Sequence, residues 1–140
     1  KYIHLRIFSV YGENDHEETL IKSDLKKLKA NEPIEMRSGG QKWNYVYVKT
    51  AARQIAELSI HAVNDETFHQ EVYNLASNDT RKLQDFIIAM KDILVSVSEL
   101  SFGGYNPDKD INLNPDTKKT VTIVKPLTSH VFEAVIKTMV

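Results

Sequence analysis

The sequence predicts a single-domain α/β protein, and three observations support this. Short segments rich in β-branched and aromatic residues alternate with longer segments whose apolar residues recur every three or four positions. The chain has 140 residues, of which 41% are hydrophobic, so one sizeable core is expected. No internal repeat, low-complexity tract or linker divides the chain.

The composition excludes several classes of protein. Lys and Arg number 18 against 19 Asp and Glu, and a net charge of −1 argues against binding nucleic acid or a membrane surface through bulk charge. The absence of Cys excludes disulfides, cysteine nucleophiles and thiolate zinc sites. No apolar run approaches the ~18 residues of a membrane span, and the start lacks a signal-peptide pattern. The cytoplasm is therefore the expected compartment.

The first third of the chain predicts a strand, a helix and a second strand. Residues 3–10 read as a largely buried strand that ends at the turn Tyr11–Gly12. Residues 16–30 have apolar residues at helical spacing, with acids early and lysines late, which suits the helix dipole. Pro33 ends this helix, and 34–37 can form a short strand.

The middle of the chain continues the alternation. Residues 43–48 are aromatic and β-branched and predict a strand, and 71–76 predict another. Helices are expected over 50–63 and 81–95. The apolar face of the first is predicted to comprise Ala52, Ile55, Ala56, Ser59, Ala62 and Val63, and that of the second Leu83, Phe86, Ile87, Met90, Ile93 and Leu94.

Capping residues and the C-terminal region complete the expected elements. Thr50 is expected to cap the helix over 50–63, and Asn78, Asp79 or Thr80 the helix that follows. Short strands are predicted at 100–102 and 120–124, separated by a turn-rich loop. The last helix is predicted to bury one face, formed by Val131, Phe132, Val135, Ile136 and Met139.

The sequence contains no recognised metal-binding, phosphate-binding or Tyr-x-x-x-Lys catalytic motif. None of the five histidines has a recognised metal-ligand spacing, so surface or partly buried positions are expected for them. The five glycines form no dinucleotide or phosphate-binding loop. Two Tyr-x-x-x-Lys pairs, Tyr45…Lys49 and Tyr105…Lys109, are interpreted as coincidental because the first lies in a strand and the second contains Pro107.

The chain begins with Lys1 and enters a predicted strand at once. Domains usually have a few loosely held residues before the first buried element. This start suggests that the 140 residues are part of a larger protein.

Five segments, in order, resemble the extended short-chain dehydrogenase/reductases, the NAD-dependent nucleotide-sugar epimerases and dehydratases. Residues 5–12 resemble "LRxFNVYGP", residues 40–52 resemble "GxxxRDFVYVDDVA", and 72–77 are similar to "VYNIGSG". Residues 114–119 and 125–129 resemble "PDxSKA" and "KPxTS". The resemblance covers almost the whole chain but only the C-terminal half of such enzymes.

The resemblance implies a fold and a division of labour. The fold would be the C-terminal part of a Rossmann-like extended fold, with late sheet strands and a small mixed α/β substrate-binding region over 1–140. The NAD or NADP site and the catalytic Tyr-x-x-x-Lys would lie upstream. This chain would then contribute nucleotide-sugar binding, with no catalytic, cofactor-binding or metal residues of its own. The parent enzyme would be a homodimer.

The resemblance also implies a substrate site, carried over residue by residue. Ser9 replaces an Asn that contacts the substrate diphosphate, Trp43 replaces an Arg on the diphosphate, and Asn44 replaces an Asp. Trp cannot supply a bidentate, charge-assisted contact, so Lys42 or Arg37 is a candidate for the lost charge. Asp116 matches an acidic residue near the substrate, with a helix N-cap as the competing role. Residues 130 and 131 look inserted, and Val135 stands where the family often has Gly.

Three hypotheses about the chain remain open. The chain is either part of an NAD(P)-dependent nucleotide-sugar epimerase or dehydratase, or a non-enzymatic relative with a binding or regulatory role, which the Arg-to-Trp difference favours. An unrelated small α/β domain is the third possibility. Alone, the chain is expected to bind no NAD(P), to catalyse no sugar oxidation and to bind nucleotide sugars weakly near Ser9, Lys42–Asn44 and Asp116.

Overall fold

The computed structural model describes residues 1–125 and 131–140. The elements are β1 (Tyr2–Ile7), β2 (Ser9–Tyr11), α1 (Leu20–Lys29), β3 (Ile34–Met36), β4 (Lys42–Tyr47), α2 (Val48–Asn64), β5 (Gln70–Leu75), β6 (Thr80–Lys82), α3 (Leu83–Leu94), β7 (Leu100–Phe102), the 3₁₀ turn η1 (Thr120–Thr122) and α4 (Val131–Met139). The predicted α/β alternation is confirmed.

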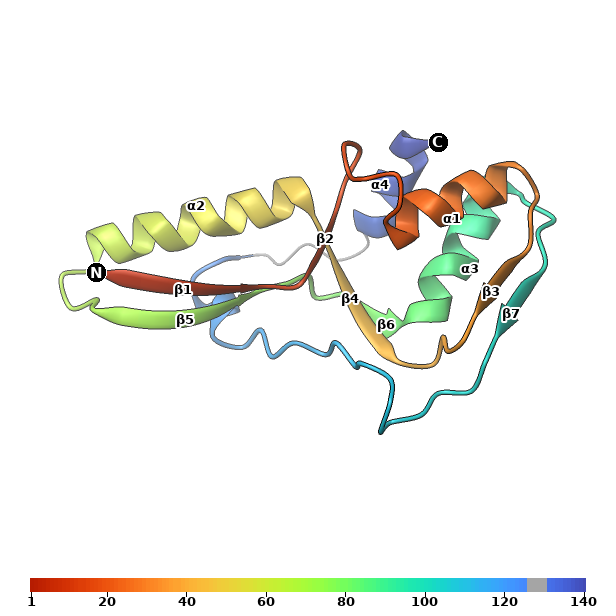
Figure 1. Cartoon of the computed structure of the whole chain (residues 1–140). Coiled ribbons are helices and arrows are strands. Elements are labelled where there is room, and N and C mark those ends of the chain that lie inside the picture. Colours follow the sequence, from red (N-terminus) through yellow and green to blue (C-terminus); the bar gives the residue numbers. More distant parts are fainter. Residues whose placement is uncertain (126–130) are drawn as a thin grey trace.

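The described strands form separate small sheets rather than one. β1 pairs with β5 in parallel, β3 pairs with β7 in parallel, and β4 lies between parallel β2 and antiparallel β6. Figure 1 shows the β1–β5 pair and α2 at one end of the molecule and the β3–β7 pair at the opposite end, with β2, β4 and β6 between them. The chain is therefore extended along the line that joins the three sheets.

The predicted strand over 3–10 is divided at Phe8. The Phe8 amide still donates to the Leu75 carbonyl at 3.1 Å, and the chain then leaves β5 and pairs with β4. β1 and β5 share one sheet as predicted. The expectation of a largely buried strand over 3–10 is wrong, because Ile7 and Val10 are 55% and 37% exposed.

Helix α1 begins later than the sequence predicts. Its expected first turn is instead a tight turn in which the backbone amide and hydroxyl of Thr19 both donate to the His16 carbonyl. The acids Asp15, Glu17 and Glu18 therefore precede the helix, and its first turn contains no acid. The lysines of its last turn lie where the dipole argument places them.

Helix α2 buries a face that shares only Ala62 with the predicted one. Its buried residues are Ala51, Gln54, Leu58 and Ala62, whereas Ile55 and Val63 are exposed. Both faces of α2 carry apolar residues, so periodicity alone could not identify the buried one. The predicted apolar faces of α3 and α4 are confirmed, with Leu83, Phe86, Ile87 and Met90 buried in α3 and Phe132, Val135 and Ile136 in α4.

The predictions of helix caps and of a strand over 120–124 are wrong. Thr50 lies inside α2, which has no side-chain cap, and Thr80 belongs to β6, whose pairing with β4 replaces the expected cap. Thr120 is in η1, where its hydroxyl donates to the Asn74 carbonyl at 2.8 Å. This contact holds η1 against β5. The β-branched residues 120–124 therefore pack against the sheet core as a turn and do not pair with a strand.

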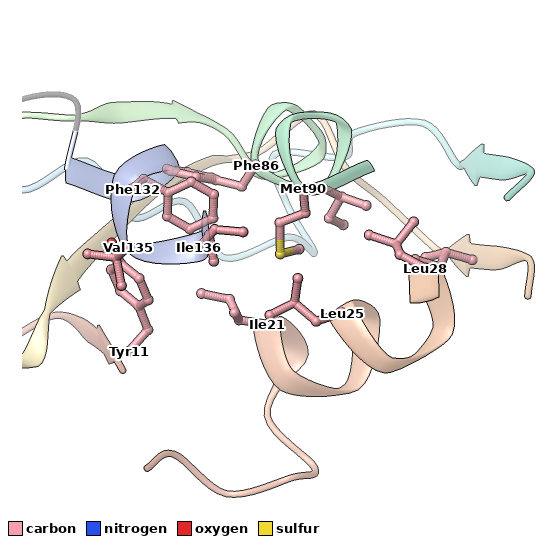
Figure 2. Packing of buried hydrophobic residues seen from close by; sticks show 11 residues of the cluster. Tyr11, Ile21, Leu25, Leu28, Phe86, Met90, Phe132, Val135 and Ile136 are labelled. Carbon is pink, nitrogen blue, oxygen red and sulfur yellow. The ribbon is translucent and has the colours of Figure 1, made fainter. Parts of the chain in front are cut away.

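Two groups of buried residues hold the fold together. The helical core comprises Tyr11, Ile21, Leu25, Leu28, Ile34, Phe86, Ile87, Met90, Phe132, Val135 and Ile136. Figure 2 shows side chains from α1, α3, α4 and β2 meeting in this core. The sheet core comprises Leu58, Ala62, Phe68, Tyr73, Leu75 and Val124 and lies between α2 and the β1–β5 pair. None of the described helices has the length and apolar character needed to cross a bilayer.

Candidate substrate-binding site

Two of the predicted site residues, Ser9 and Trp43, line one cavity. Ser9 begins β2 and stands opposite Tyr45 in the parallel pairing, so β4 places Trp43 two residues before that partner. The cavity has a volume of about 310 Å³, and its wall also includes Asp15, Thr19 and Leu20 from the segment that leads into α1. We refer to it as the Ser9 cavity.

Trp43 is a partly buried wall of the Ser9 cavity. Its ring centroid lies 6.4 Å from that of Tyr45, at the margin of the helical core. The indole N–H is enclosed and has no hydrogen-bond partner among the described residues. Since buried donors are normally paired, this N–H is an exception, and its enclosure leaves the ring of Trp43 as the part that can meet a ligand.

Lys42 is held by its backbone and has an exposed side chain. The Leu113 amide donates to the Lys42 carbonyl at 2.8 Å, and the Lys42 amide donates to Asn112 Oδ1 at 2.6 Å. These bonds fix the main chain immediately before Trp43. The main chain of Lys42 is therefore fixed, while its ammonium group is exposed to solvent.

Asn44 lies in the interior, behind the cavity. It is completely buried, and its amide nitrogen donates to the Ser77 carbonyl and to Thr80 Oγ1, both at 2.9 Å. Its carbonyl oxygen accepts from the backbone amide of Ser77 at 3.0 Å. The side chain thus ties β4 to the connection between β5 and β6, and no part of it is exposed to a ligand.

Asp116 lies on a different part of the surface from the Ser9 cavity. Its carbonyl accepts from Asn74 Nδ2 at 2.8 Å, which places it beside β5, and its exposed carboxylate accepts from the Lys118 amide at 2.9 Å. The latter bond closes a local turn ahead of η1, whose N-cap is Lys119 without a side-chain cap, so Asp116 does not hold the N-cap position of η1.

A second cavity, which sequence reasoning missed, surrounds Asp24. It measures about 320 Å³ and lies between α1, β3 and the start of β4. Its lining comprises Leu20, Asp24, Ile34, Glu35, Met36, Arg37, Ser38, Gln41 and Asp110. Asp24 follows Ile21 by three positions and precedes Leu25, so a charge on the apolar face of α1 was the available signal.

Of the buried carboxylates that line this Asp24 cavity, Asp110 has an ion-pair partner, whereas Asp24 has none among the described residues. Arg37 forms a 2.9 Å ion pair with Asp110, and the Asn106 amide also donates to that carboxylate, at 2.7 Å. These contacts hold the pKa of Asp110 below its usual range, chiefly through the backbone hydrogen bond. Asp24 is 6% exposed, and burial raises its pKa to about 6. Arg37, a candidate for the lost phosphate charge, therefore faces this cavity.

The remaining motif candidates are the two Tyr-x-x-x-Lys pairs and the metal-ligand side chains. Tyr45 lies in β4 and Lys49 in α2, and residues 105–109 lie outside the helices, so neither Tyr-x-x-x-Lys pair shares a helix. Burial raises the pKa of Tyr45 well above its usual range, which keeps the phenol neutral. No group of three or more His, Asp or Glu suited to a metal occurs among residues 1–125 and 131–140.

A sequence profile of the NAD dependent epimerase/dehydratase family matches residues 1–76, more than half of the chain. The chain belongs to this family. The resemblance of its segments to extended short-chain dehydrogenase/reductases is confirmed, although the "KPxTS" segment and the inserted residue 130 fall largely outside the described residues.

Other members of the epimerase/dehydratase family agree with this assignment. CDP-abequose synthase from Yersinia pseudotuberculosis is 25% identical over 84% of this chain and 40% of its own length. UDP-glucuronic acid 4-epimerase from Bacillus cereus, solved with UDP-glucuronic acid and NAD, gives a TM-score of 0.74 at 18% identity over 95% of this chain and 42% of that one. UDP-glucose 4-epimerase from Thermotoga maritima, solved with UDP-glucose, gives 0.76 at 19% identity over 97% and 43%.

These comparisons also show how much of the family's length is present. The chain spans about two fifths of each of these relatives. The structural similarity, at less than a fifth identity, establishes the Rossmann-like extended fold.

Proposed function

We propose that this chain is the C-terminal, substrate-binding part of an NAD(P)-dependent nucleotide-sugar epimerase or dehydratase, with the cofactor and catalytic residues in a preceding half. The observation that carries the proposal is the meeting of Ser9 and Trp43 in one cavity of a chain from this family. Family membership supplies the reaction class, hydride transfer that permits epimerisation or elimination. The parent enzyme is a cytoplasmic homodimer under this proposal.

The residues of this chain bind and orient the substrate. The Ser9 hydroxyl donates to a diphosphate oxygen, the Trp43 ring forms a wall of the cavity, and the Lys42 ammonium supplies the charge that Trp43 cannot. Asn44 acts indirectly, because its buried hydrogen bonds fix the strand that carries Trp43. Asp116 contacts the substrate only if its turn moves toward the cavity, since its carboxylate is engaged with the Lys118 amide.

Four of the five glycines pack against the protein itself, and only Gly104 has open space beside its Cα. A Cβ atom on Gly12, Gly39, Gly40 or Gly103 would lie 2.7, 2.9, 2.8 or 1.9 Å from atoms of Val48, Gln84, Tyr105 or Arg37 respectively. These glycines therefore allow close packing within the protein and leave no cradle for a pyrophosphate. We assign NAD(P) binding to the preceding half.

One surface supports the existence of that half. β1 pairs only with β5 among the described strands, so its other edge has free main-chain groups. Tyr2 and Ile7 on β1 and Ile60 and Val63 on α2 are all more than half exposed. A further parallel strand beside β1 and a layer over α2 would cover these groups.

The alternative is a non-enzymatic relative that binds nucleotide sugars without turning them over. The observation that favours it is Trp43 in place of a phosphate-binding Arg. The full-length protein distinguishes the two, because only the enzyme interconverts sugars in the presence of NAD(P).

Chemical-shift mapping of the chain with UDP-glucose, CDP-glucose and GDP-mannose tests the proposed function. Shifts are expected at Ser9, Lys42 and Trp43, with dissociation constants in the millimolar range because half of the cleft is absent. Ser9→Ala should weaken binding about threefold to tenfold, whereas the exposed control Ser59→Ala should leave it unchanged. Shifts away from the Ser9 cavity, or saturable one-to-one heat with NAD, would contradict the proposal.

A further inference from the structure

A depression lies along α1, beside the end of α4. It has a volume of about 430 Å³, larger than the Ser9 cavity or the Asp24 cavity. Leu25 and Met139 supply apolar side chains to its lining, and Glu17, Lys22, Lys26 and Lys29 supply charged ones. The four lining residues of α1 are three or four positions apart, so they share one face of the helix. We refer to this depression as the α1 groove.

The charges along the α1 groove are separated by sign. Glu17 precedes α1, whereas Lys26 and Lys29 lie in the last turn of the helix. The whole segment 13–29 keeps this order. It contains four acids followed by four lysines, namely Glu13, Asp15, Glu17 and Glu18 and then Lys22, Lys26, Lys27 and Lys29. Because the numbers balance except for the buried Asp24, the surface of this segment has little net charge but one negative end and one positive end.

Both ends of the α1 groove can accept a partner. Lys26 and Lys29 are exposed, and neither forms an ion pair with any residue in 1–125 or 131–140. Glu17 contacts Lys22 at 3.2 Å, but its side chain stays 76% exposed and can accept further hydrogen bonds. Lys22 also donates to the Glu13 carbonyl at 3.2 Å, so its charge is used within its own chain. The groove therefore offers a carboxylate at one end and two ammonium groups at the other.

A second copy of this chain complements both ends of the α1 groove. A two-fold axis across the groove makes the two α1 helices antiparallel, so Glu17 of each copy faces Lys26 and Lys29 of the other. An acidic peptide would complement the lysines but would be repelled by the acids of 13–18. The preceding half would attach beside β1, whereas α1 lies toward the β3–β7 end of the molecule (Figure 1). The charge pattern therefore favours a second copy over these two occupants.

We propose that the α1 groove is a surface through which two copies of this chain associate, with their α1 helices antiparallel. The symmetry forms each ion pair twice, and the aliphatic stems of Lys26 and Lys29 would pack near Leu25 and Met139. Exposed ion pairs are individually weak and are screened by salt, so the association is weak and depends on ionic strength. The interface lies within this chain, so the proposal does not depend on nucleotide-sugar binding.

Sedimentation velocity of the 140-residue chain tests the association. A dimer is expected at about 20 mM NaCl, and its dissociation constant should rise about tenfold when NaCl is raised to about 300 mM. Lys29→Glu places like charges opposite Glu17 at both symmetric positions and should weaken the dimer about tenfold. Lys118→Glu is the matched control, because it makes the same change in net charge at an exposed lysine near β5. The control should leave the dissociation constant unchanged within about twofold.

An exchange of charges identifies the paired residues. Glu17→Lys should also weaken the dimer, but a mixture of the Glu17→Lys and Lys29→Glu chains restores opposite charges at both positions. This mixture should form a heterodimer about as stable as the unsubstituted dimer. A monomer at both salt concentrations, equal losses in Lys29→Glu and Lys118→Glu, or no heterodimer from folded variants would each overturn the proposal. The salt dependence of the unsubstituted chain does not rely on whether a variant folds, and none of these outcomes bears on ligand shifts at the Ser9 cavity.

Discussion

The helical core and the sheet core differ in how completely they are enclosed. The helical core is closed by α1, α3 and α4 and contains an aromatic cluster in which Phe86 lies 4.8 Å from Phe132 and 5.0 Å from Tyr45, centroid to centroid. The sheet core has α2 on one side of a pair of strands, and Tyr2 and Ile7 on those strands are exposed. One region has buried its apolar surface, and the other has not.

This difference indicates where the chain is self-sufficient. Burial of apolar surface is the main source of folding free energy, so the helical core should hold most of the stability of the isolated chain. The exposed apolar residues of β1 and α2 would add to the stability of the sheet core only if a further layer buried them. Exposed apolar side chains on β1 and α2 thus mark the surface at which this chain would contact a further layer.

The largest effect is expected from Phe86→Ala, which tests the helical core. Phe86 is completely buried, and its removal leaves a cavity among rings, so the free energy of unfolding should fall by about 3–5 kcal/mol. Urea denaturation followed by circular dichroism measures this. Ile88→Ala, on the same helix at 38% exposure, is the control and should cost less. Equal losses would mean that the helical core is not the stable part.

Asp24→Asn should stabilise the helical core. Burial raises the pKa of Asp24 from 3.8 to about 6, so ionising it in the folded state costs about 3 kcal/mol, and the neutral amide avoids this cost. The folded pKa is the higher one, so the gain is complete above pH 6 and disappears below about pH 4. Urea denaturation of both proteins from pH 4 to 8 measures the difference. A gain that is constant with pH would contradict this origin.

Asn44→Ala should loosen the junction between the two regions. Asn44 joins β4, beside the helical core, to the β5–β6 connection, and its loss leaves the buried Ser77 amide without an acceptor. We expect destabilisation of about 2 kcal/mol. Hydrogen exchange should show faster exchange at Ser77 than at α3. Unchanged protection of Ser77 would show that another group replaces the side chain.

The smallest effect is expected from Ile7→Thr on the exposed face of β1. Because Ile7 is already 55% exposed, the free energy of unfolding of this chain should change by less than about 0.5 kcal/mol. In the full-length protein the same substitution should cost more, since we propose that Ile7 is covered there. Thermal melts of both forms test this. The same small change in both would remove the argument for a covering half.

The sequence predicted correctly those features that depend on neighbouring residues in the chain. It failed for features that depend on contacts with distant segments. The faces of α3 and α4 followed from periodicity, because each helix has one apolar stripe. For α2 periodicity gave the wrong face, since both faces are apolar. The division of 3–10 at Phe8 depends on β4 and β5, which are more than 30 residues away in the chain.

The candidate site was predictable only through the resemblance to a family. The resemblance grouped Ser9 and Trp43 around one substrate, and the structure places both in the lining of one cavity. The interior position of Asn44 depends on Ser77 and Thr80, which no local pattern connects to it. Asp24 was not predicted as a feature of interest, because a single charged residue on an apolar helix face matches no known motif.

The unpaired edge of β1 has a consequence for handling the isolated chain. A row of free main-chain groups flanked by Tyr2 and Ile7 is a template on which a second molecule can add a strand. Self-association through this edge would grow with protein concentration and would broaden β1 and β5 resonances first. Dilute samples, or a charged residue at position 7, would therefore keep the chain monomeric for the titrations.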